Sequence, residues 1–202
     1  MEFRLIYEGP LPSNGNATIK HAIRKKFHGQ LKELWATHRF LQLMKERVTL
    51  EPGFTGSTFL NALARRFKVE GFHFVPLVNN VYGLICGLDI LFLRKGKPGD
   101  LVMPGGDIDN RIKTLLDALR MPHNQNEIGD TPDAEEEPFF CLVEDDALIT
   151  EVNITTDRLL TTVKSESRHP QNDVFLVIRV SVKAAEPLTL GNLTMTEIGK
   201  YL

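Results

Sequence analysis

The sequence predicts an α+β protein in which a small mixed sheet packs against helices. Three observations support this class. Segments with apolar residues at every second position, the spacing of a strand, occur at the start of the chain, near its centre and toward its end. Longer segments with apolar residues three and four apart, typical of helices with one buried face, lie between them. The chain shows no internal repeat.

The composition is that of an ordinary globular domain. The chain has 202 residues, of which 42% are hydrophobic and 25% charged, and this length can bury a core. No long apolar run is free of charge, so we expect no membrane span. The start lacks the features of a secretory signal, and Cys86 and Cys141 lie in apolar surroundings that predict buried thiols. We therefore expect a cytoplasmic protein.

The first quarter of the chain predicts a strand and a long helix. Phe3–Tyr7 has strand character, and the segment 10–15, rich in Pro, Asn and Gly, predicts a loop. Helical spacing then runs from Ala17 to about Arg47, with Gly29 as a weak point midway. The basic residues outside the apolar stripe predict a solvated polar face, with a phosphate-binding face as the alternative; they are Lys20, Arg24, Lys25 and Lys32.

The second quarter predicts a short helix and a strong strand. Ser57 can cap a helix that reaches about Phe67, and the apolar segment 72–78 is of uncertain type. The segment 82–93 predicts a strand with both faces largely buried. Asp89 is an unexpected charge there. An ion pair with an arginine is the favoured interpretation, and a fourth metal ligand is the alternative.

An acidic helix follows. Asp109 suits the N-cap of a helix that starts at Asn110. An apolar stripe at helical spacing predicts its buried face, formed by Ile112, Leu115, Leu116 and Leu119. The spacing of four residues aligns Asp109, Lys113 and Asp117 on an adjacent face.

The rest of the chain predicts an acidic loop and strands. The segment 123–138 is polar and predicts a flexible excursion; its run Glu135–Glu137 predicts a solvated loop, with a gate over the acidic centre as the alternative. The apolar run 139–143 leads into Glu144, Asp145 and Asp146. Alternation then predicts strands over 148–154 and 174–182.

The clustered carboxylates predict a metal site. Asp107 and Asp109 point the same way if the backbone there is extended, and a second pair, Asp145 and Asp146, precedes a strand. Carboxylate oxygens gathered at one point suit a hard cation such as Mg²⁺. The structural alternative is a capped helix and a polar turn without metal.

The acidic helix and its partner segment resemble the RusA family of Holliday-junction resolvases. That family has an Asp-x-Asp-Asn segment at a helix start, a lysine one turn later, a Leu-Asp-Ala-Leu-like end and a downstream Asp-Asp pair. The corresponding residues here are Asp107, Asp109, Asn110, Lys113, Asp117, Asp145 and Asp146, and Pro12-Ser13-Asn14 matches the family's turn after the first strand.

This resemblance implies a RusA-like fold and a function. It implies one domain over 1–202, with insertions at about 50–80 and 122–140 and a C-terminal extension over 184–202. It implies a Mg²⁺-dependent endonuclease that resolves four-way DNA junctions as a homodimer. Asp107, Asp109 and Asp146 would bind the metal, Lys113 would assist catalysis as a positive charge or would hold Asp109 or Asp117, and the supporting residues would be Asn110, Asp145 and Asp117.

Two further interpretations remain. The net charge of −2 and the acidic insertion favour a catalytically silent RusA-like subunit that binds DNA or protein. A hydrolase of smaller phosphates is the other, although no phosphate-binding loop is visible in the sequence.

Overall fold

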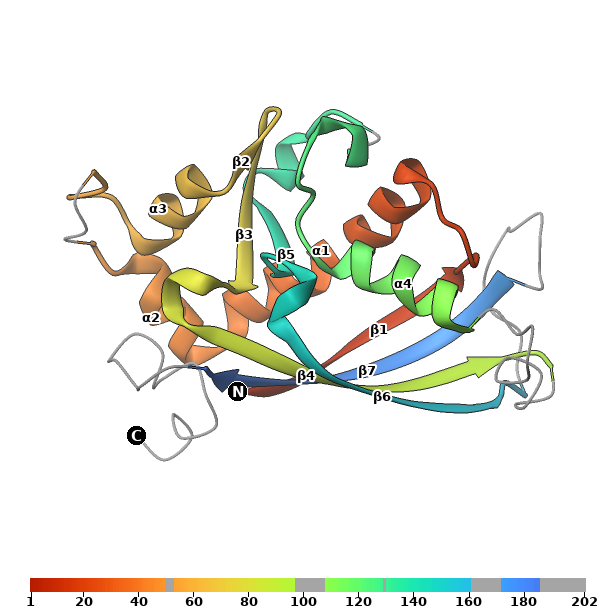
Figure 1. Ribbon diagram of the computed structural model, residues 1–202. Helices are drawn as coiled ribbons and strands as arrows, with labels where there is room; N and C mark the ends of the chain where they lie inside the picture. The colour runs from red at the N-terminus through yellow and green to blue at the C-terminus, as the bar shows by residue number, and fades with distance from the viewer. Residues whose placement is uncertain (50–52, 97–107, 129, 161–171, 186–202) are drawn as a thin grey trace.

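The computed structural model confirms the α+β class (Figure 1). It describes residues 1–49, 53–96, 108–128, 130–160 and 172–185. This part of the chain contains a four-stranded sheet, a three-stranded sheet and four α-helices. All the α-helices lie on one side of the four-stranded sheet, as Figure 1 shows.

The four-stranded sheet has the order β1-β7-β4-β6. Strands β1 (Glu2–Pro10), β7 (Asp173–Ala184) and β4 (Leu84–Arg94) are antiparallel, and β6 (Ile149–Arg158) is parallel to β4. Every second residue of β7 and β4 is buried beneath the helices, as the alternation predicts.

The prediction that both faces of β4 are buried was wrong. Leu91 is 37% exposed, and Asp89 and Leu93 are half-buried. The reason is that helices cover only one face of this sheet, so the apolar side chains on the other face remain in contact with water. The strand also begins later than predicted, at Leu84, because Tyr82 belongs to the short 3-10 helix η1 (Asn80–Tyr82).

The segment 72–78, whose type the sequence left uncertain, is a strand of the three-stranded sheet. Residues 72–78 form strand β3 (Phe72–Val78), which pairs in parallel with β5 (Phe139–Val143) and antiparallel with the short β2 (Lys68–Val69). Every residue of β5 is buried. Its near-continuous apolar sequence reflects burial on both faces, which is typical of a parallel strand.

The predicted helix over 17–47 is two helices. Helix α1 (Ala17–Thr37) continues through Gly29 and ends before His38, and α2 (Arg39–Glu46) follows. His38 has extended backbone angles (φ −74°, ψ 112°), so the chain changes direction there. This turn lets Leu41 and Met44 reach the core and brings α2 against α3 (Phe59–Arg66).

The core combines aromatic side chains with two buried histidines. Phe72, Phe74 and Phe139 are fully buried, and the rings of His28 and Phe139 lie 4.4 Å apart between centroids. His21 contacts Phe72 edge-on with a centroid separation of 5.5 Å. These contacts fasten α1 to the three-stranded sheet.

Both cysteines are buried and free, as predicted. Burial raises the pKa of the Cys86 thiol to about 12 and raises that of Cys141 further. A raised pKa keeps each thiol protonated at neutral pH and therefore unreactive.

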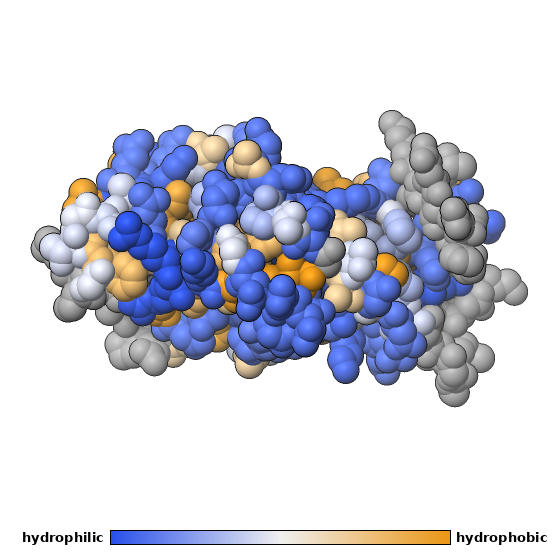
Figure 2. Space-filling model, turned by 90° about the horizontal axis from the view of Figure 1, so that it is seen from above, coloured by the Kyte–Doolittle hydropathy of each residue, from blue (hydrophilic) through white to orange (hydrophobic). Residues whose placement is uncertain are grey.

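In the part of the chain that the structure describes, no helix has the length and apolar character needed to cross a membrane. The helix-bearing side is mostly hydrophilic, and its hydrophobic residues appear as small separate patches (Figure 2).

Candidate functional site

Helix α4 (Ile108–Leu119) carries most of the predicted site. It begins earlier than predicted, so Asp109 lies inside its first turn and is not the N-cap. The predicted apolar stripe anchors the helix, since Ile112, Leu115 and Leu119 are buried and Leu116 is half-buried. Asp107 lies outside the described residues.

The outward face of the first turns of α4 presents one acid, one amide and one base. Asp109, Asn110 and Lys113 are all exposed. No ion pair joins Lys113 to Asp109 or Asp117, although the spacing of four residues would allow one. Lys113 therefore keeps its charge available to an anion approaching this face.

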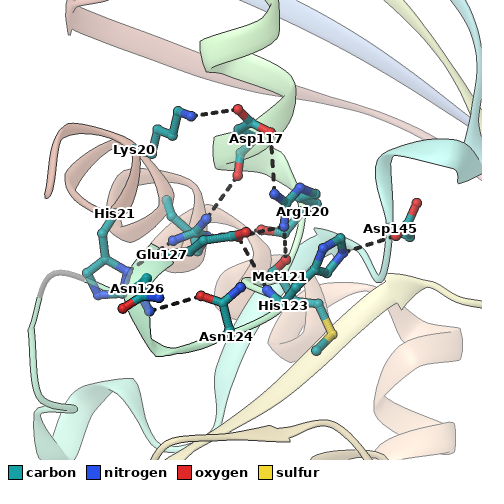
Figure 3. A network of polar contacts seen from close by, with 11 residues as sticks. Lys20, His21, Asp117, Arg120, Met121, His123, Asn124, Asn126, Glu127 and Asp145 are labelled. Atoms are coloured by element: carbon teal, nitrogen blue, oxygen red, sulfur yellow. Dashed lines mark hydrogen bonds and ion pairs between the residues drawn. The ribbon is translucent and has the colours of Figure 1, made fainter. Parts of the chain in front are cut away.

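Asp117 follows Asp109 and Lys113 at the same spacing of four residues, but its surroundings differ from theirs. It is buried and forms ion pairs with Lys20 of α1 at 2.7 Å and with Arg120 at 3.4 Å (Figure 3). These contacts join α1 to the C-terminal end of α4. Asp117 therefore helps to fix the packing of α1 against α4.

The buried guanidinium of Arg24 completes this junction. It donates to the backbone oxygens of Asp117 at 2.9 Å and Arg120 at 3.0 Å, and its third contact is His21 Nδ1 at 3.1 Å. The carbonyls at a helix C-terminus have no partner within the helix, and Arg24 supplies one. Burial lowers the pKa of Arg24 to about 10, which leaves it charged at neutral pH.

The second acidic pair follows β5. Asp145 caps the 3-10 helix η5 (Asp146–Leu148) by accepting a hydrogen bond from the Ala147 N–H at 2.9 Å. It also pairs with His123 at 3.0 Å (Figure 3). The Ala147 hydrogen bond and the His123 charge hold the pKa of Asp145 below its usual value. Asp145 therefore lies in a capped turn directly before strand β6.

The second pair lies beside the C-terminal end of α4. The Met121 N–H donates to the Val143 oxygen at 3.0 Å, which joins the chain after α4 to the end of β5. Asp109 is three helical turns before Arg120, roughly 16 Å along the axis at a rise of about 1.5 Å per residue. Asp146 is exposed at the start of η5, and η5 contacts α4.

Within the described ranges, no three histidine, cysteine or acidic side chains lie close enough together to hold a metal ion. The predicted set of Asp107, Asp109 and Asp146 includes a residue outside those ranges, so it stays a prediction. Asp109 and Asp146 are both exposed carboxylates without an ion pair to another described residue.

Asp89 has the partner that the favoured interpretation expected. Arg179 contacts it at 3.3 Å, and Asn153 donates to it at 3.1 Å. These residues lie on the face of the four-stranded sheet away from α4, so Asp89 belongs to a surface network apart from the candidate site.

The lysines of α1 are neither a freely solvated face nor an open phosphate surface. Lys25 pairs with Asp130 and Glu136, both at 3.0 Å, and Lys32 pairs with Glu135 at 3.1 Å. The acidic segment after α4 thus neutralises the exposed side of α1. The segment also pairs with His73 of β3 through Glu137 and with Arg120 through Glu127, and none of its ion pairs joins Asp109 among the described residues.

The buried polar residues of α1 were not predicted. Arg24 and His28 are buried, in line with the core residues Leu31 and Trp35. Their spacing at 24, 28, 31 and 35 follows the helical period, and this spacing was the available signal. The charge of Arg24 hid it, because charged residues are rarely buried.

No family model, curated protein or solved structure matches this chain.

Proposed function

We propose that the protein is a Mg²⁺-dependent endonuclease that cuts branched DNA, such as four-way junctions. One observation carries the proposal. The first turns of α4 expose Asp109, Asn110 and Lys113 side by side. The charges of Asp109 and Lys113 have no ion-pair partner among the described residues. The charges next to them, on Lys20, Asp117 and Arg120, are paired. An acid and a base left available on one helix face are what a metal-dependent phosphodiesterase needs.

The donor chemistry fits magnesium. Mg²⁺ prefers oxygen ligands and needs only one or two protein carboxylates, because water and substrate phosphate complete its shell. Asp109 offers an exposed carboxylate near the start of α4, and Asp107 would add a second, whereas Asp146 lies beside the other end of this helix. When bound at such a site, Mg²⁺ lowers the pKa of water and balances charge on the phosphate.

The remaining residues support this reaction from fixed positions. Lys113, one turn after Asp109, would stabilise negative charge that develops on the phosphate oxygens. Asn110 can donate a hydrogen bond to the same group. Asp145 caps the turn that Asp146 begins and pairs with His123, so it fixes the position of Asp146 beside the C-terminal end of α4.

A cleavage assay tests the proposal. Purified protein is incubated with labelled four-way junction, linear duplex and flap DNA, with and without Mg²⁺. We expect Mg²⁺-dependent cutting of branched DNA, reduced at least about 100-fold in Asp109→Asn because a charged ligand is lost. Glu46→Gln removes the same charge at an exposed position of α2 and should cut normally. Full activity in Asp109→Asn would disprove the assigned site.

A catalytically silent subunit is the second candidate. The pairing of Lys25 and Lys32 with the acidic segment favours it, because the pairs reduce the positive surface available to DNA. Binding of the junction without cutting in the same assay would support this candidate.

We also propose that the protein forms a homodimer, since two symmetric cuts in a four-way junction require two active sites. The edge of the sheet at β6 is the candidate interface. At the other edge, the Ile6 N–H and C=O of β1 already bond to the Gln30 side chain, at 2.8 and 2.7 Å. On β6, Val152 and Ile154 are each 37% exposed.

A further inference from the structure

A polar pocket of about 190 Å³ lies between the loop after β1 and the outward face of α4. This volume equals about six water molecules at roughly 30 Å³ each, which is enough for a phosphate group with part of its sugar. The side chains that line it are mainly hydrogen-bond donors: Ser13, Asn14, Lys20, Asn110, Lys113 and Thr114.

Close contact between the loop and the helix forms this pocket. The Gly15 N–H donates to Thr114 Oγ1 at 3.2 Å. A Cβ added at Gly15 would lie 2.6 Å from Thr114 Cγ2, a separation that real Cβ atoms do not show. Asn16 then caps α1 by accepting from the Ile19 N–H at 2.9 Å. These contacts hold the end of the loop, and the Leu11 N–H, which donates to the Asn172 oxygen at 2.8 Å, holds its start, so the pocket is preformed.

The charges around the pocket favour an anion. Its carboxylate, Asp117, is shared between Lys20 and Arg120 and so is already compensated. Lys113 is exposed and has no ion pair with another described residue. A second pocket of about 210 Å³ shares Gly15, Lys20 and Asp117 and extends the polar surface toward Arg24 and Arg120. A cation would meet these positive charges with no unpaired carboxylate to bind it.

We propose that this pocket binds a backbone phosphate of the nucleic acid, one position along the strand from the phosphate cut beside Asp109. Lys113, which also faces the cut phosphate in the proposed function, supplies the charge, and Ser13 and Asn14 supply neutral donors. Lys113 lies one helical turn from Asp109, roughly 6 Å along the axis. The identification of the ligand as DNA rests on the proposed function, whereas the anion chemistry rests on the pocket itself.

Binding without Mg²⁺ tests the pocket separately from cleavage. The probes are a fluorescent four-way junction, followed by anisotropy, and inorganic phosphate as its competitor. Asn14→Asp adds a carboxylate at an exposed position and should weaken junction binding at least about 5-fold, because like charges repel. It should also lower the salt dependence of binding by about one phosphate contact. Asn61→Asp makes the same change on α3, at the other end of the molecule, and should bind as the wild type does (Figure 1).

The outcomes separate the two proposals. Ser13→Ala provides a milder second variant, which should weaken binding about 3-fold through one lost hydrogen bond. Weakened binding by both pocket variants, with competition by phosphate, supports the pocket even if the wild type cuts no DNA. Equal binding by Asn14→Asp and wild type, or no binding of either probe by the wild type, would overturn it.

Discussion

Asp117 and Lys113 lie four residues apart on one helix face, yet their surroundings give them different roles. Asp117 is buried between Lys20 and Arg120, whereas Lys113 is exposed. Removing one partner of a buried ion pair costs stability, while an exposed lysine contributes little to folding. Substitutions at Asp117 therefore test the packing of α1 on α4, and substitutions at Lys113 test function.

His21 predicts a pH dependence of stability. Burial, and then the charges of Arg24 and Lys25, lower its pKa to about 4, against about 6.5 in an unfolded chain. Below pH 6.5 the unfolded state binds a proton that the folded state rejects, so stability falls as the pH drops toward 4. The loss attributable to this residue is on the order of 2 kcal/mol.

Urea unfolding at several pH values between 7 and 4 measures this effect. His21→Gln removes the titrating group and keeps an acceptor for Arg24, so the decline in unfolding free energy with falling pH should be shallower than in the wild type. The decline should not vanish, because burial also lowers the pKa of His28. Parallel curves for the two proteins would exclude His21 as a source of the dependence.

At the scale of elements, periodicity located the helices better than it located their ends. The apolar spacing continues from α1 into α2 across His38, so the sequence showed one helix where the structure has two. The acidic segment after α4 was predicted to be flexible. It instead contains the short 3-10 helices η3 (Gln125–Glu127) and η4 (Ala134–Glu136). Ion pairs between residues far apart in the sequence join it to α1.

The N-cap of α3 provides a test with a matched control. The sequence predicts Ser57 as this cap, but the Thr58 hydroxyl accepts the hydrogen bond from the Asn61 N–H at 3.3 Å. Thr58→Ala should therefore lower the free energy of unfolding by about 1 kcal/mol. Ser57→Ala should change it by less than about 0.5 kcal/mol. Chemical denaturation compares the two, and a larger loss at Ser57 would contradict the observed cap.

For the whole molecule, β6 is an edge strand of the four-stranded sheet in the part of the chain that the structure describes. If two copies of the chain pair through β6, the substitution Ile154→Lys should separate them, because charged side chains on an edge strand oppose strand pairing. Light scattering after size-exclusion chromatography should show a dimer for the wild type and a shift toward monomer for Ile154→Lys. Ile6→Lys, at an exposed apolar position on the β1 edge strand, should stay dimeric. A monomeric wild type would reject the dimer.

The α+β class, the strands with clean alternation and the buried stripe of α4 could be predicted from the sequence alone, because they depend on the local spacing of apolar residues. The sequence also supplied the acid and base pattern from which the nuclease function is proposed. Which charges are already paired could be learned only from the folded chain. Arg24 donates a hydrogen bond to the end of α4. Lys25 and Lys32 form ion pairs with the acidic segment, and Asp89 forms one with Arg179. In each case the partners are far apart in the sequence. The physical reason is that an ion pair depends on distance in space, which apolar spacing along the chain does not specify.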